Sequence, residues 1–324
     1  MVPLPLTGLN EPIPTTPPRA PGSVRRTSTI DMRSIAGGGL ALDGAARDIR
    51  TAADGHAVEV LDQARVRARL DEAHVLVSIA TSAPDALTEP LVGLTVRRGF
   101  RDAVHQHLPA KAIDSTALGL LLDELPVAAL ISGYALLYSG ELGATTPSAG
   151  SLQADICAGW RSDGTMIVSL VTTGTLPVPM GPEVNSLTDD DPDGWHEMAP
   201  LPPATMRRQR LIDVDPGAPH AVRAMFRDTH ADKAGRTTIL HEYSLATTYD
   251  PEHDALGTVL ATPHVLPWDE CPAAADSAAR LDGRAPGELR ELVRDELRGT
   301  STCTHLNDLL RSLANISALA SSTG

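Results

Sequence analysis

The feature of this 324-residue chain that most constrains its fold is a repeated order of short motifs. Three segments return 180 to 182 positions later: Val24–Asp31 (VRRTSTID) as Met206–Asp213 (MRRQRLID), Ala46–Thr51 as Phe226–Ala231, and Val77–Pro84 as Thr258–Val265. A fourth, Val92–Leu108, returns at an offset of 190 as Asp282–Leu297. Ordered matches at a nearly constant offset indicate a tandem duplication. The alternative is chance similarity in a composition rich in arginine and alanine.

Each copy shows the same change of pattern along its length. Its first part alternates polar and apolar residues with a period of two around turn signals such as DPEHD, which predicts an antiparallel meander. Its second part has helical spacing, which in the second copy places Leu289, Leu292, Val293 and Leu297 on one stripe and Leu306, Leu309, Leu310 and Leu313 on another. The expected fold class is α+β, with each meander backed by helices on one face.

These patterns divide the chain into five parts. We expect a flexible, proline-rich N-terminus at 1–22, a first repeat at 23–135, a connector at 136–205, a second repeat at 206–316 and a flexible tail at 317–324. The connector is expected to be β-rich, with a hairpin in DICAGWRSDGTMIVSL that turns at Ser162-Asp163-Gly164 and an acidic loop in TDDDPDGWHEM.

Charge and hydropathy exclude several classes of protein. The net charge is −14, which argues against a nucleic-acid partner and against docking on anionic lipid. The most apolar stretch, Ala117–Tyr138, carries Asp123, Glu124 and Pro126, so we do not expect it to span a membrane. The N-terminus has no basic start typical of an export signal. With three cysteines, the expected location is the reducing cytoplasm; the oligomeric state is left open.

Common catalytic and nucleotide-binding motifs are absent, and no nucleotide cofactor is expected. A set of chemically active residues is instead spread over the second copy: His241 on the hairpin, Cys271 ahead of the helices, and Cys303 with His305 at the start of the last helix. The N-terminus of a helix stabilises a thiolate, so Cys303 suits a nucleophile or a metal ligand.

This order of residues resembles the NifU/IscU scaffold family, especially its zinc-bearing SufU branch. His241-Glu242-Tyr243 stands where that family has C-G-D on the hairpin, Cys271 matches the second cysteine, and Cys303 matches the third at the start of the last helix. The chain also resembles a bacterial domain-of-unknown-function family marked by RRTSxID, CAGW, HEYSL, ECPAAA and CTHLND.

The resemblance implies a metal site formed by His241, Cys271 and Cys303. Histidine and cysteine are preferred ligands of Zn²⁺, and three protein ligands leave a fourth position for water or substrate. His305 would act as acid, base or fourth ligand, and Asp308, three residues later on the helix, would orient its imidazole.

Tyr243 and Glu242 flank the first ligand as candidate proton donors. Strand alternation places Tyr243 on the face of His241 and Glu242 on the other, which favours Tyr243. Second-rank pocket residues are Asp155, Cys157 and Trp160 of DICAGW, and His196. The competing interpretation is that the cysteines are inert core residues.

We therefore expect an enzyme that acts on a small carbonyl-containing molecule by zinc-assisted or Cys/His acid–base chemistry, as lyases, isomerases and hydrolases do. Two alternatives stay open. One is a zinc- or iron–sulfur-handling accessory protein of NifU/IscU type, and the other is a small-molecule-binding protein without chemistry.

Overall fold

The structure is a computed structural model that describes residues 4–35, 37–97, 99–139 and 154–324. Within these residues nine strands form one antiparallel sheet in the order β10-β9-β8-β7-β2-β3-β4-β5, and β11 pairs with β9. The bounds are β2 Val24–Ile35, β3 Gly39–Thr51, β4 Val58–Leu70, β5 Leu76–Thr81, β7 Thr205–Val214, β8 His220–Ala231, β9 Thr237–Asp250, β10 Ala255–Leu256 and β11 Leu260–Val265. A separate two-residue pair joins β1 (Leu4–Pro5) to β6 (Pro179–Met180).

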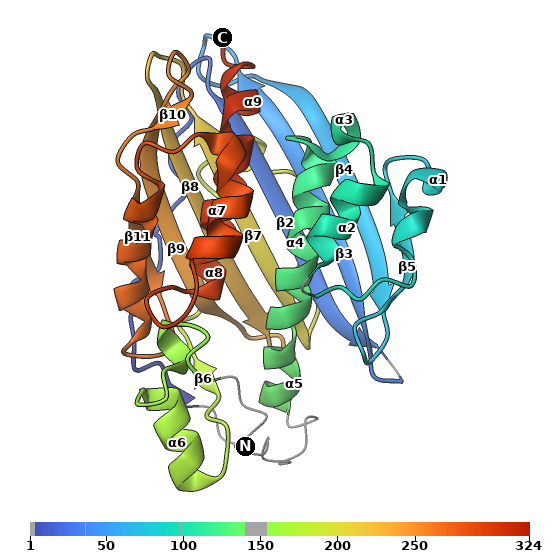
Figure 1. Cartoon of the computed structure of the whole chain (residues 1–324), viewed down its shortest axis with the longest axis vertical. Coiled ribbons are helices and arrows are strands. Elements are labelled where there is room, and N and C mark those ends of the chain that lie inside the picture. Colours follow the sequence, from blue (N-terminus) through green and yellow to red (C-terminus); the bar gives the residue numbers. More distant parts are fainter. Residues whose placement is uncertain (1–3, 36, 98, 140–153) are drawn as a thin grey trace.

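The α-helices that pack on this sheet lie on one of its faces, so the chain is α+β; the other face, without α-helices, is called the helix-free face (Figure 1). The α-helices are α1 Asp85–Thr88, α2 Phe100–His107, α3 Ala110–Ile113, α4 Ala117–Ile131, α5 Gly133–Ser139, α6 Thr165–Thr173, α7 Leu289–Glu296, α8 Thr304–Ser312 and α9 Ile316–Ala320. The 3₁₀ helices are η1 Glu89–Leu91, η2 Ala158–Trp160, η3 Pro192–Gly194, η4 Cys271–Leu281, η5 Pro286–Glu288 and η6 Leu313–Asn315.

The two halves of the sheet meet at the central pair of strands, β2 and β7. From this pair, β3, β4 and β5 follow in order on one side, and β8, β9 and β11 follow on the other. Two ion pairs cross the seam in mirrored positions: Arg25 Nε lies 2.6 Å from Asp213, and Arg207 Nε lies 2.6 Å from Asp31. All four residues come from the matched motifs VRRTSTID and MRRQRLID.

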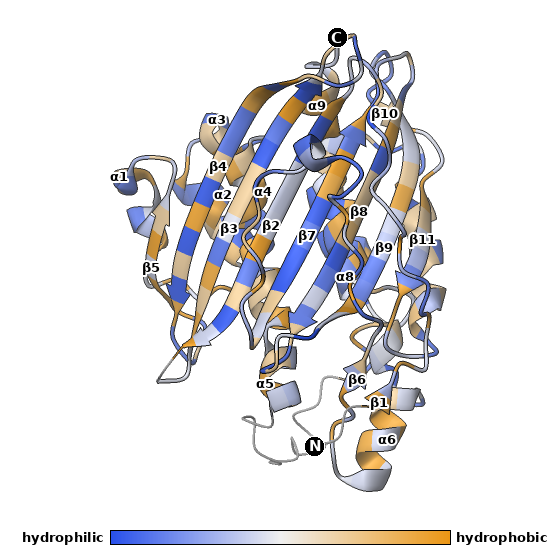
Figure 2. Cartoon of the chain, turned by 180° about the vertical axis from the view of Figure 1, so that it is seen from behind, coloured by the Kyte–Doolittle hydropathy of each residue, from blue (hydrophilic) through white to orange (hydrophobic). Residues whose placement is uncertain are grey.

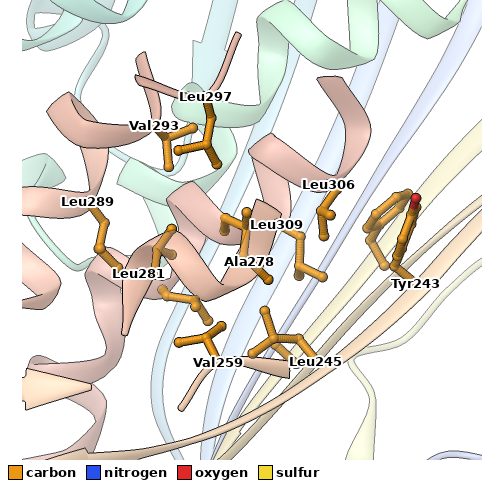
Figure 3. Packing of buried hydrophobic residues seen from close by; sticks show 14 of the residues in the cluster. Tyr243, Leu245, Val259, Ala278, Leu281, Leu289, Val293, Leu297, Leu306 and Leu309 are labelled. Carbon is orange, nitrogen blue, oxygen red and sulfur yellow. The ribbon is translucent and has the colours of Figure 1, made fainter. Parts of the chain in front are cut away.

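Apolar side chains between sheet and helices form two clusters. One joins β7–β9 to η4, α7, α8 and α9, and the other joins β2–β5 to α2 and α4. In the first cluster, Leu306 and Leu309 of α8 lie next to Tyr243 and Leu245 of β9, and Leu289 of α7 lies next to Leu281 (Figure 3). The helical stripes predicted from the sequence are confirmed, because all eight of their apolar residues are buried.

The connector differs from its predicted β-rich form. Where a hairpin was expected, the chain forms the turn η2 and then the helix α6, and before β7 its described part contributes only the two-residue strand β6. The reason lies far away in the sequence: Glu270 accepts hydrogen bonds from the backbone N–H and the hydroxyl of Thr165 at 2.8 and 2.9 Å. This carboxylate satisfies the first turn of α6, whose donors have no partner within the helix.

The described residues of the proline-rich N-terminus and those of the C-terminal tail make specific contacts with the rest of the protein. The described residues of the N-terminal segment cross the helix-free face of the sheet (Figure 2). A proline has a backbone carbonyl but no N–H, so a proline-rich segment has acceptors in excess. Buried arginines bind such carbonyls: Arg25 donates to Pro17 O and Arg227 donates to Ile13 O. In the tail, Leu319 of α9 is buried, and the Gly324 N–H donates to Gly22 O.

One helical stretch in the described residues, Ala117–Ser139, is long and apolar enough to cross a membrane by length and composition alone. More than half of its apolar window is buried inside the protein, where α4 packs on β2, β3 and β4. The stretch is placed as a core helix of a soluble protein would be.

Candidate active site

A layer of buried charged side chains separates the two apolar clusters on the helix-covered face. On β7, Met206 belongs to one cluster and Ile212 to the other, while Arg208 and Arg210 lie between them with 1% exposure each. Carboxylates from the helices complete this layer, for example Glu124 of α4, which pairs with Arg210. Burying charge is costly unless it is paired, so each unpaired donor in this layer needs an explanation.

Two arginine–aspartate pairs in this layer come from matched positions of the two halves, but only one is fully bonded. Arg26 binds Asp48 through two N–H groups at 2.7 and 2.5 Å, and its other contacts are Asn315 Oδ1 and Ser115 O. Arg208 reaches Asp228 only through Nη1, at 3.1 and 3.2 Å.

In the Arg208–Asp228 pair, two nitrogens of the guanidinium group therefore remain without a hydrogen bond. Nε and Nη2 of Arg208 are buried without a hydrogen-bond partner, although Nη2 lies 3.4 Å from Asp308 in an ion pair. The guanidinium stacks on Phe226, 4.4 Å from the ring centroid.

A β-bulge brings His241 to the same place. Asp228 of β8 faces His241 of β9, and the register shifts between Asp228 and Thr229. Bulges of this kind re-aim a side chain and are frequent next to active sites. The imidazole of His241 stacks on that of His305 from α8, with ring centroids 3.8 Å apart and an angle of 22° between the planes.

Asp228, His241 and His305 together form a set of potential metal ligands. Among the described residues, their ligand atoms all lie within 4.8 Å of one another. His241 Nδ1 lies 3.4 Å from Asp228 Oδ2 but makes no hydrogen bond, so this buried nitrogen is available. Burial, together with the nearby His241 and Arg208, lowers the pKa of His305 well below its usual value, which keeps its imidazole neutral and able to bind a metal.

Residues 206–319 match the family model described as "Protein of unknown function (DUF2889)". This DUF2889 segment, 206–319, includes Arg208, Asp228, His241, Cys303 and His305, so the whole site belongs to it. No curated protein and no solved structure matches the chain.

The cysteines of the DUF2889 segment lie next to this site but outside the set of close ligand atoms. Cys303 Sγ is 3.8 Å from His305 Nδ1, and Cys271 Sγ lies against Gly159, where an added Cβ would approach it to 2.6 Å. Of the predicted ligands His241, Cys271 and Cys303, the set contains only His241.

Burial decides the state of these thiols. It raises the pKa of Cys303 despite the backbone N–H groups at the start of α8 that favour the thiolate. It also raises the pKa of Cys271. At Cys303, burial therefore opposes the stabilisation of a thiolate that the start of the helix provides.

The proposed proton donors separate onto two faces of β9, as strand alternation predicts. Tyr243 faces the helices, where its hydroxyl donates to Cys271 O at 3.3 Å and interacts with Cys303. Burial raises its pKa, so Tyr243 keeps its proton. Glu242 faces the other side of the sheet, where it binds Arg227 and the N–H of Ile13, and does not meet the histidines.

Asp308 does not orient His305, which corrects the expected i,i+3 contact. Its carboxylate instead accepts hydrogen bonds from Arg101, at 2.6 Å, and from Arg210. Nδ1 of His305 has the Cys303 sulfur and the Thr304 hydroxyl as its neighbours. α8 presents Asp308 to the charged layer because the sheet beneath it carries arginines.

The second-rank pocket residues divide in the same way. Cys157 lies near Cys271 and Cys303, and Trp160 packs on the apolar cluster. Asp155 closes a loop by accepting a hydrogen bond from the N–H of Ser162. His196 lies on the opposite face of the sheet, hydrogen-bonded to Thr27 and Thr29 at 2.9 and 2.8 Å. Burial and nearby arginines lower its pKa to about 3, so it is a neutral structural group.

Two residues of the site, Arg208 and Asp228, were not singled out from the sequence. A signal was present in the repeat itself: the second arginine of VRR and MRR and the aspartate of ARD and FRD recur in both copies. A charged residue at a core-facing position of a strand needs a buried partner of opposite charge. In each copy, the arginine of the first motif pairs with the aspartate of the second.

Proposed function

We propose that this chain is an enzyme that acts on a small carbonyl-containing molecule, with Asp228, His241 and His305 holding a Zn²⁺ ion. The observation that carries the proposal is the convergence of their ligand atoms within 4.8 Å, with His241 Nδ1 lacking a hydrogen bond. Imidazole and carboxylate ligands suit zinc, and three of them leave a position for substrate.

Bound zinc would polarise a carbonyl oxygen as a Lewis acid. The chain's own residues supply the rest. The N–H groups of Arg208 that make no hydrogen bond, Nε above all, can stabilise negative charge that develops on an oxygen. Tyr243, Cys303 and His305 form a line of neighbouring groups, two of them protonated, that can pass a proton to or from the reacting atom. This combination serves lyases and isomerases, and also hydrolases.

A second candidate is the same acid–base chemistry without a metal. The observation that favours it is the position of Arg208, because a buried cation beside Asp228 already neutralises that carboxylate. In this case Arg208 would be the electrophilic group and the neutral His305 the base.

Metal analysis of the purified protein separates the two candidates. The zinc-dependent enzyme should contain about one zinc per chain, and His305→Ala and Asp228→Asn should lose it, whereas the control Cys157→Ser should keep it. Cobalt substitution adds a second measurement, since a sulfur-to-cobalt charge-transfer band appears only if a cysteine is a ligand. We expect no such band; its presence would replace the present ligand set with one that includes Cys303.

Activity is tested by incubating the chain with a panel of small aldehydes, ketones and esters and following their conversion by NMR. We expect conversion by the wild-type chain and by Cys157→Ser, and none by His305→Ala. A His305→Ala variant that converts substrate as fast as wild type would remove the proposed centre. A cluster or sulfur carrier is less well supported, because all three cysteines are buried.

We also propose that residues 23–135 and 206–316 are tandem copies, the second related to the NifU/IscU scaffolds, and that the protein is cytoplasmic. The mirrored pairs Arg25–Asp213 and Arg207–Asp31 support the duplication, as does the occurrence of a bulge after Asp48 as well as after Asp228. In the first copy, Asp62 occupies the place of His241, facing Asp48, and binds the N–H of Ala117 instead. The three free cysteines suit a reducing compartment.

A further inference from the structure

The helix-free face of the sheet is covered in one half and open in the other. The segments 10–20 and 185–200 cross β8, β7 and β2 and reach β3 at Arg47, while β4 and β5 remain exposed (Figure 2). Arginines alternate along β4 on this open face, at 65, 67 and 69. A groove of about 580 Å³ lies here, opposite the candidate active site, and its lining includes Arg33, Arg67, Arg69, Ala41, Ala80 and Ile35.

Strand register places two of these arginines around a small residue. One row of directly paired residues runs across five strands in the order Thr205, Arg33, Ala41, Arg69 and Ser78. Adjacent strands are about 4.8 Å apart, so the backbones of Arg33 and Arg69 are separated by roughly 10 Å. Alanine between them leaves open space that two long side chains can close over from both sides.

The charges in this row are not balanced. The neighbouring row brings Asp31 and Asp43 into the lining of the groove, but both are paired: Asp31 with Arg207 at 2.6 Å and Asp43 with Arg67 at 3.5 Å. No acidic residue lies in the row of Arg33 and Arg69, and in the described part of the chain neither arginine has an ion pair. Two unpaired guanidinium groups on a chain of net charge −14 form a local site for an anion.

We propose that this row binds an organic anion, with its carboxylate, sulfonate or phosphate held between Arg33 and Arg69 over Ala41 and its apolar body on the groove floor. The groove volume lies within the range of small-molecule sites, roughly 300–1,000 Å³. The lining beside the arginines includes the apolar residues Ala80 and Ile35, which suits an aliphatic or aromatic body better than a bare inorganic anion. The exposed Ser78 at the end of the row offers a further hydroxyl donor.

A fluorescence titration with 8-anilinonaphthalene-1-sulfonate tests this site in the full chain, because the probe combines a sulfonate with an aromatic body. We expect one saturable site in the wild type and an affinity reduced about tenfold or more in Arg33→Gln/Arg69→Gln. The control is Arg50→Gln, an exposed arginine paired with Glu59 on the same strands, which should bind like wild type. Circular dichroism verifies that each variant is folded.

Competition defines the ligand class. Octanoate should displace the probe, while 1-octanol and inorganic phosphate at the same concentrations should not. Equal displacement by octanol would show a purely apolar surface, and equal displacement by phosphate a bare anion site; either result overturns the proposal. Unchanged binding in the double variant, or no saturable site in the wild type, overturns it as well.

Discussion

The two matched arginine–aspartate pairs should differ in what they contribute to stability. Replacing Asp48 by Asn removes the charge that accepts two short bonds from Arg26, at 2.7 and 2.5 Å, in a fully bonded pair. Replacing Asp228 by Asn removes the charge that accepts longer contacts from a single nitrogen of Arg208, at 3.1 and 3.2 Å. A hydrogen bond to a charged group contributes about 1.5–3 kcal/mol, and breaking a buried ion pair costs about 3–5 kcal/mol.

We therefore expect Asp48→Asn to lower the free energy of unfolding by about 3–5 kcal/mol and Asp228→Asn by about half as much. Urea denaturation measures both, provided that the m-value is unchanged. The control is Glu59→Gln, whose exposed pair with Arg50 should contribute about 0–1 kcal/mol. If Asp228→Asn costs as much as Asp48→Asn, the Arg208–Asp228 pair is an ordinary structural bond, and its free donors are no sign of a binding site.

Three further variants probe the packing and the pH response. Gly159→Ala places a Cβ 2.6 Å from the Cys271 sulfur and should lower the free energy of unfolding by about 1–3 kcal/mol. Its control is Gly133→Ala, in a helix with nothing within 4 Å of the added Cβ, which should leave stability unchanged or raise it. Equal melting temperatures of the two variants would contradict this. Leu309→Ala removes a fully buried side chain of α8 and should lower the free energy of unfolding, measured by urea denaturation, by about 2–5 kcal/mol. A loss below about 1 kcal/mol would mean that neighbouring side chains move to fill the cavity. The pKa of His196 is lowered to about 3, so between pH 6.5 and 3 the unfolded chain binds a proton that the folded chain does not, and stability falls as the pH falls. His196→Gln should reduce that slope by about 1.4 kcal/mol per pH unit, and an unchanged slope would mean that the folded histidine is protonated.

The sequence alone determined the layers of the fold, because periodicity reports which side of an element is buried. Alternation predicted the meanders, and the leucine stripes of α7 and α8 predicted which side of each helix faces the sheet. Local alternation also separated Tyr243 from Glu242 on β9. Each of these properties depends on residues within a few positions of one another.

Only the tertiary structure decided the contacts between distant segments. Glu270 accepts hydrogen bonds at the start of α6, where a hairpin was predicted, and buried arginines bind carbonyls of the proline-rich N-terminus. A bulge places His241 against Asp228 and His305. The charges and donors were visible in the sequence, but their partners lie many residues away along the chain. A buried polar group takes whichever partner the packed chain brings within hydrogen-bond distance, and that choice is made by the fold as a whole.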